Sequence, residues 1–160
     1  MMFKFATAGI LVLALGLSYR TAYAQAGQSQ DAMTSAVDVL THLPESEMAT
    51  FTKRVLPGTV ARTNEAWRPF IPEEARPPKL EKGKVAIEVS LYPDGKIREM
   101  RLALSSGRVA LDRAAWGALT NAQPFGALPP ELSGGPIRLR FYFLYNLTKN
   151  EDSGSSPTRK

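Results

Sequence analysis

The sequence contains no cysteine and only one histidine, His42. Without cysteine there can be no disulfide bond, no thiolate zinc site and no cysteine nucleophile. A single histidine also argues against a serine–histidine triad and against a multi-histidine metal site. Glu45 and Glu47 follow His42 at a spacing that matches no metal-ligand pattern, which favours a surface helix end. We therefore expect no enzyme activity, no metal and no cofactor.

The sequence also has little net charge. Its formal charge is +5 at pH 7, and the loss of residues 1–24 would lower it to +3, because Lys4 and Arg20 are the only charged residues among them. This bias is mild, and it gives no support for nucleic-acid binding.

The apolar run near the N-terminus, residues 5–19, is shorter than the ~20 residues that cross a bilayer. It follows Lys4 and precedes the small-residue sequences Ala22-Tyr23-Ala24 and Ala24-Gln25-Ala26. This layout is typical of a cleaved secretory signal peptide. We predict a signal peptide over residues 1–24, with a retained N-terminal anchor as the alternative.

Residues 25–61 are predicted to be a spacer with helical segments. Ala36, Val37, Leu40 and Leu43 give residues 32–43 a weak helical periodicity, which Pro44 ends. A second helix is expected to start at Ser46 or Thr50 and to be interrupted by Pro57-Gly58, and a third, short helix is expected over 60–67. The polar tail, residues 147–160, is predicted to be disordered.

Residues 83–145 contain three segments with the period-two pattern of half-buried strands. The first, 83–92, ends at the turn sequence Pro93-Asp94-Gly95, and the second runs from 96 to about 105. In the second segment the apolar positions change parity, and an extra residue near Arg98-Glu99 would restore them to one face, so we predict a β-bulge there. A helix over 111–122, rich in alanine on its apolar side, separates these strands from the third, 137–145.

The order β-β-α-β predicts an α+β fold with a three-stranded antiparallel sheet of strand order 2-1-3 and a crossover helix, preceded by additional N-terminal helices. The strand over 137–145 then lies at the edge of the sheet. An edge strand has unpaired N–H and C=O groups that can pair with an extended peptide. The outward side chains of this strand would provide selectivity, which makes the candidate partner-binding residues Arg138, Arg140, Tyr142 and Leu144. The alternative is that the two arginines only protect the edge against aggregation.

Several short motifs along residues 62–146 together resemble the C-terminal domain of TonB-family proteins, which is also related to TolA. The entry segment Pro72-Glu73-Glu74-Ala75-Arg76 is one of them. The others, in order, are Gly83-Lys84-Val85, Asp94-Gly95-Lys96-Ile97, Ser105-Ser106-Gly107, Leu111-Asp112-Arg113-Ala114-Ala115, Pro124-Phe125, Leu128-Pro129-Pro130-Glu131 and Leu139-Arg140-Phe141-Tyr142-Phe143.

The resemblance implies a protein of the periplasm or cell envelope of Gram-negative bacteria, involved in energy-dependent transport across the outer membrane. Its implied partners are a TonB-box peptide of an outer-membrane TonB-dependent receptor, bound by the strand over 137–145, and an inner-membrane proton-channel complex. A homodimer through the same edge is a further expected association.

The chain departs from a full transducer at two places. Residues 5–19 are short and lack histidine, and residues 25–60 contain only Pro44 and Pro57 where a transducer has a long proline-rich spacer. The alternative reading is therefore an exported, non-catalytic envelope adaptor or scaffold with the same fold.

Overall fold

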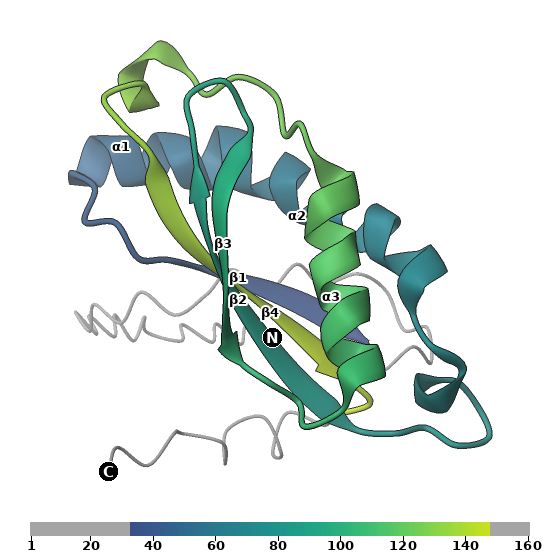
Figure 1. The fold of residues 1–160 in the computed structure, drawn as a ribbon. Helices are drawn as coiled ribbons and strands as arrows, with labels where there is room; N and C mark the ends of the chain where they lie inside the picture. Colours follow the sequence, from purple (N-terminus) through teal and green to yellow (C-terminus); the bar gives the residue numbers. More distant parts are fainter. Residues whose placement is uncertain (1–32, 148–160) are drawn as a thin grey trace, which may run out of the picture.

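A four-stranded antiparallel sheet forms the centre of the computed structural model, which describes residues 33–147 (Figure 1). The strands are β1 (Thr34–Val39), β2 (Gly83–Leu91), β3 (Ile97–Leu104) and β4 (Ile137–Tyr145), in the order β1-β4-β2-β3. The α+β class and the antiparallel sheet are confirmed, as are the pairings of β2 with both β3 and β4. The predicted three-stranded order is wrong, because β1 adds a fourth strand on the outer side of β4.

The helices pack against one another and against one face of the sheet. A continuous helical run contains α1 (Glu45–Thr50), the π-helical turn η1 (Phe51–Val55) and α2 (Leu56–Trp67), and α3 (Val109–Ala122) follows β3 (Figure 1). Three single 3-10 turns lie in the connections: η2 (Arg68–Phe70), η3 (Glu73–Ala75) and η4 (Pro130–Leu132). We call the sheet face opposite α2 and α3 the outer face.

The alternation of β4 decides which of its side chains enter the core. Ile137, Leu139, Phe141, Phe143 and Tyr145 are all buried between the sheet and the helices. On α3 the buried side consists largely of alanine, which lets the helix lie close to the sheet. The alternation predicted for residues 137–145 and the alanine-rich apolar side predicted for the helix over 111–122 are both confirmed.

A hydrogen-bonded chain of side chains joins α2, β4 and α3 inside this core. The indole N–H of Trp67 donates to the Tyr145 hydroxyl at 2.9 Å, and that hydroxyl donates to the carbonyl of Leu111 at 2.9 Å. Burial raises the pKa of Tyr145 above its ordinary value. Each polar atom in this chain therefore has a partner, as a buried polar group requires.

The N-terminal part of the described chain differs most from the sequence predictions. The helix predicted over 32–43 is wrong, since residues 34–39 form β1. The predicted interruption at Pro57-Gly58 is also wrong, because Pro57 lies in the first turn of α2, directly after the π-helical turn η1, and the helical run continues through it. The predicted signal peptide over 1–24 and the tail from 148 onward lie outside the described residues.

Within residues 33–147, no helix combines the length and the apolar character that crossing a bilayer requires.

Candidate functional site

The outer edge of β4 is occupied by β1 from Leu139 to Leu144. Thr34 lies opposite Leu144, and the register continues to Val39 opposite Leu139. The predicted free edge is therefore wrong: β4 lies between β1 and β2. The error has one source, the assignment of residues 32–43 to a helix, which left no segment to pair with this edge.

Hydrogen bonds at the end of β1 reveal which main-chain groups of β4 face this edge. The N–H of Leu40 donates to the carbonyl of Arg138 at 2.8 Å, and the N–H of Arg138 donates to the Thr41 hydroxyl at 2.7 Å. Main-chain groups in an antiparallel strand alternate between its two neighbours. The N–H and C=O groups of Arg140, Tyr142 and Leu144 therefore point toward β1 as well.

The four predicted partner-binding residues thus lie together on β4, and they share two properties. Their main-chain groups face the β1 edge, and their side chains lie on the outer face of the sheet, where Arg138 is exposed, Arg140 and Tyr142 are half-buried and Leu144 is buried. Which partner they bind is not decided by this placement, so the assignment stays a prediction.

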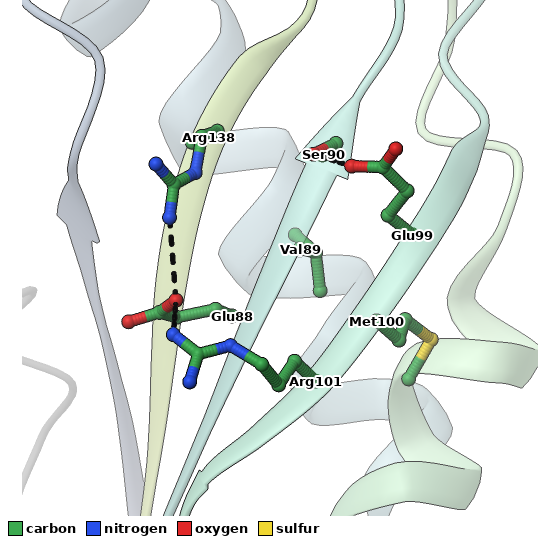
Figure 2. Close-up of a pocket in the computed structure, with 7 residues that line it drawn as sticks. All are labelled: Glu88, Val89, Ser90, Glu99, Met100, Arg101 and Arg138. Carbon is green, nitrogen blue, oxygen red and sulfur yellow. Dashed lines mark hydrogen bonds and ion pairs between the residues drawn. The ribbon is translucent and has the colours of Figure 1, made fainter.

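An ionic cluster on the outer face holds the two arginines of β4 in place. The buried carboxylate of Glu88 on β2 accepts hydrogen bonds from Arg101 on β3, from Arg140 at 3.0 Å and from Arg138 at 3.4 Å. Figure 2 shows Arg138 and Arg101 converging on this carboxylate from the two strands that flank β2. We call Glu88 with its three arginines the Glu88 cluster.

The arginines keep Glu88 ionised. The hydrogen bond from Arg140 lowers the pKa of Glu88 most, Arg101 lowers it further, and burial of the carboxyl opposes both. The sequence places Glu88 and the arginines on the same face of their strands, but it does not reveal that three of them reach a single carboxylate. The cluster is the feature of this site that sequence reasoning missed.

Beside the Glu88 cluster lies a shallow depression of about 210 Å³ between β2 and β3. Its lining includes Val89, Met100 and the pair of Ser90 and Glu99, in which the serine hydroxyl donates to the carboxylate at 2.8 Å (Figure 2). Within residues 33–147 no group of three or more histidine, aspartate or glutamate side chains could hold a metal ion. The polar side chains that line the depression bond to one another, in the Glu88 cluster and in the pair of Ser90 and Glu99.

β1 itself contributes few buried side chains. Val37, opposite Phe141, is the buried residue of β1, whereas in β2 all residues from Val85 to Leu91 are buried. Ser35 adds one side-chain hydrogen bond, to Asn64 on α2 at 2.5 Å. Elements with few buried apolar contacts open at low free-energy cost, so β1 is released from the sheet more easily than the central strand β2.

Comparison with known protein families gives a match to the family described as TonB C terminal, over residues 60–143. The chain belongs to the TonB C-terminal family. This confirms the resemblance stated above, and it identifies an envelope-associated, non-catalytic type of domain that interacts with proteins. The matched TonB C-terminal region includes β2, β3, α3 and most of β4, whereas β1 and α1 precede it.

The comparisons with curated proteins and with solved structures each give no match.

Proposed function

We propose that this TonB C-terminal domain binds an extended peptide of an outer-membrane receptor by strand addition to the outer edge of β4. The binding serves energy-dependent transport across the outer membrane, and it takes place in the periplasm after export. Membership of the family supports the general role, and the structure of the edge supports the mode of binding.

The observation that carries the proposal is the pairing of β1 with β4. A six-residue extended segment from outside the family region already lies on this edge in continuous antiparallel register. The main-chain groups of β4 are therefore arranged to accept a strand, and they can accept a receptor peptide in the place of β1.

Affinity and selectivity come from different groups in this arrangement. The main-chain N–H and C=O groups of Arg138, Arg140, Tyr142 and Leu144 supply hydrogen bonds that any extended peptide can make. The side chains of Arg138, Arg140 and Tyr142 lie beside the bound strand on the outer face and favour peptides that carry an acidic or aromatic residue there.

Site-specific photo-crosslinking tests the proposal on the full chain. The probes are synthetic peptides from the periplasmic N-termini of outer-membrane receptors encoded in the same genome. A photoreactive phenylalanine analogue replaces Tyr142 at the β4 edge in one variant and Leu102 on β3, 40% exposed at the opposite edge of the sheet, in a matched control. We expect crosslinks to receptor peptides from position 142 and none from position 102.

The opposite pattern, crosslinks from position 102 alone, would place the binding edge on β3 and overturn the proposal. If no receptor peptide reacts at either position while the chain captures cell-wall material from an envelope extract, the adaptor or scaffold reading replaces it.

A further inference from the structure

We infer that residues 33–41 are an internal ligand of the β4 edge, which a partner peptide with the same side-chain pattern must displace. This inference rests on the proposed function, since it assumes that the partner uses this edge. It adds a competition within the chain and a chemical description of the peptide.

The competition follows from where β1 comes from. The family match begins at residue 60, so the strand that closes the β4 edge is supplied by the segment that precedes the family region. That segment contributes the six residues of β1 and two further hydrogen bonds, from the N–H groups of Leu40 and Thr41 to the carbonyl of Arg138 at 2.8 and 3.4 Å. One edge cannot pair with two strands at once, and a partner peptide and β1 therefore exclude each other.

The attachment of β1 suits a replaceable strand. All six residues of β1 pair with β4 in an antiparallel ladder of main-chain hydrogen bonds, which an incoming strand of different sequence can reproduce. Only Val37 is buried to 8% exposure, and the other residues of β1 are half-buried or exposed. The exchange of β1 for another strand therefore uncovers one core residue, Val37, and leaves the rest of the buried side chains in place.

The register of β1 describes the peptide on its core side. Ser35 lies opposite Phe143, Val37 opposite Phe141 and Val39 opposite Leu139. The large side chains of β4 already fill the space beneath the helices, so their partners are small or β-branched. A fitting peptide has small or β-branched residues at three alternate positions.

On the outer face, the register of β1 predicts an acidic residue in the partner peptide at the position opposite Arg140. Asp38 lies opposite Arg140, and Ala36 lies opposite Tyr142. The Glu88 cluster contains three arginines and one carboxylate, so an acid at the position of Asp38 meets an excess of positive charge. The structure thus assigns to the partner an extended peptide with an acidic residue opposite Arg140, flanked by small or β-branched residues.

Occupation by β1 weakens the apparent affinity for the partner. Only the fraction of molecules with β1 released can bind, and the apparent Kd rises by the inverse of that fraction. By linkage, bound peptide displaces β1 to the same extent that β1 opposes the peptide.

A reversible lock of β1 tests the competition in the full chain, which has no cysteine of its own. Ala36 and Tyr142 are directly opposite, and opposite residues in antiparallel strands lie about 4.5–5.5 Å apart between Cα atoms, within the range of a disulfide. The variant Ala36→Cys with Tyr142→Cys is compared with itself in the oxidised and the reduced state. The probes are a fluorescent peptide of residues 33–41 and the receptor peptides described above.

We expect binding of both probes in the reduced state and a loss of at least about tenfold in affinity on oxidation.

A second variant acts in the other direction: Val37→Asp places a charge in the core position of β1, and it should bind both probes about tenfold more tightly than the unmodified chain. Leu102→Asp on β3 is the matched control and should leave both affinities unchanged. Circular dichroism checks that each variant remains folded.

The outcomes separate the two proposals. Receptor peptides that bind equally well in the oxidised, reduced and Val37→Asp forms would overturn the internal competition and the β4 edge as the place of binding, and would leave only the recognition of a receptor peptide standing. Binding of the 33–41 peptide to the reduced and Val37→Asp forms only, with no receptor peptide bound, would support the competition and overturn the receptor assignment. Absence of binding by both probes in all forms would overturn both.

Discussion

At the scale of single residues, glycine is required at position 95 both by the β2–β3 turn and by the close approach of Gly126, in the loop that follows α3. It has a positive φ of 79° in the predicted turn Pro93-Asp94-Gly95, and a β-carbon there would overlap the main chain of Gly126. The N–H of Phe125 donates to the carbonyl of Gly95 at 2.9 Å, which draws the two segments together. The β2–β3 turn therefore depends on glycine for both conformation and space.

The first prediction concerns the substitution Gly95→Ala. We expect it to destabilise the domain by about 1–3 kcal/mol from backbone strain, with the overlap with Gly126 adding to this. The free energy of unfolding from urea titration measures the effect. Gly134→Ala is the control, since a β-carbon at Gly134 has no atom within 4 Å. Equal stabilities of the two variants would contradict the prediction.

The second prediction follows from the lowered pKa of Glu88. In the unfolded chain this carboxyl has its ordinary pKa of about 4.3 and binds protons more readily than in the folded chain, where the pKa is lowered. Its contribution to stability is therefore present above this pH and is lost as the pH falls through the lower folded-state pKa. Replacement by glutamine removes the charge that three arginines bind.

We expect Glu88→Gln to be about 1.5–3 kcal/mol less stable than the unmodified chain at pH 7, the range for hydrogen bonds to a charged group. The difference should shrink as the pH falls below about 4, because the unfolded chain then takes up a proton at Glu88 that the folded chain does not bind. Urea titrations between pH 3 and pH 7 test this, with Glu65→Gln on the exposed side of α2 as the control. A difference that stays constant with pH would show that the Glu88 carboxylate is not what the arginines stabilise.

At the scale of the elements, β4 is one of the two central strands: it pairs on both sides, and its large side chains fill the core. Phe141 is fully buried, lies opposite Val37 on one side and Ile87 on the other, and stacks with Phe125 at a ring-centroid distance of 6.4 Å. We expect Phe141→Ala to cost about 3–5 kcal/mol and to shift the urea midpoint accordingly. An unchanged midpoint would mean that the ring does not pack in the core.

The strands β2, β3 and β4 could be predicted from the sequence because their alternation is carried by large apolar residues. The bulge near Arg98 could be predicted from the change in parity alone: Ser90 pairs with Glu99 and Leu91 with Ile97, which leaves Arg98 unpaired. A second irregularity, at Ala103, was missed, and it places Leu104 opposite Ala86 on the outer face.

β1 could not be predicted from the same signal. Its core-facing positions are Ser35, Val37 and Val39, and the polar serine interrupts the alternation while the later Leu40 and Leu43 suggest a helix. The β-branched residues Thr34, Val37 and Val39 within six positions were the available hint. A strand with one buried side chain has only a weak pattern of alternating apolar and polar residues, and this pattern is the signal that predicts strands.

This weak attachment gives a prediction for hydrogen exchange of the full chain. Amides of β1 should exchange faster than those of β2, because β1 can leave the sheet without opening the core, whereas β2 is buried on both faces. Mass spectrometry of peptic fragments that cover residues 34–39 and 83–91 measures both. Equal protection of the two strands would mean that β1 opens only when the whole domain unfolds.

At the scale of the whole molecule, the family role depends on how the N-terminus is held. Export is expected on either reading of residues 1–24, but only a retained segment would tether the domain to the inner membrane, and tension on such a tether would reach β1 first. A free N-terminus leaves the domain to bind without pulling.

The cleaved form is the prediction argued from the sequence, because fifteen apolar residues are too few to span a bilayer and two small-residue sites follow them. We expect the protein purified from the periplasm of its host to begin at Gln25 or Gly27, which intact-mass and N-terminal sequencing measure directly. Replacement of Ala22 and Ala24 by residues with large side chains is the control, and it should leave the precursor uncleaved in the membrane fraction. An unmodified chain found intact in the inner membrane would instead support an anchored transducer, in which force passes through β1 to the β4 edge.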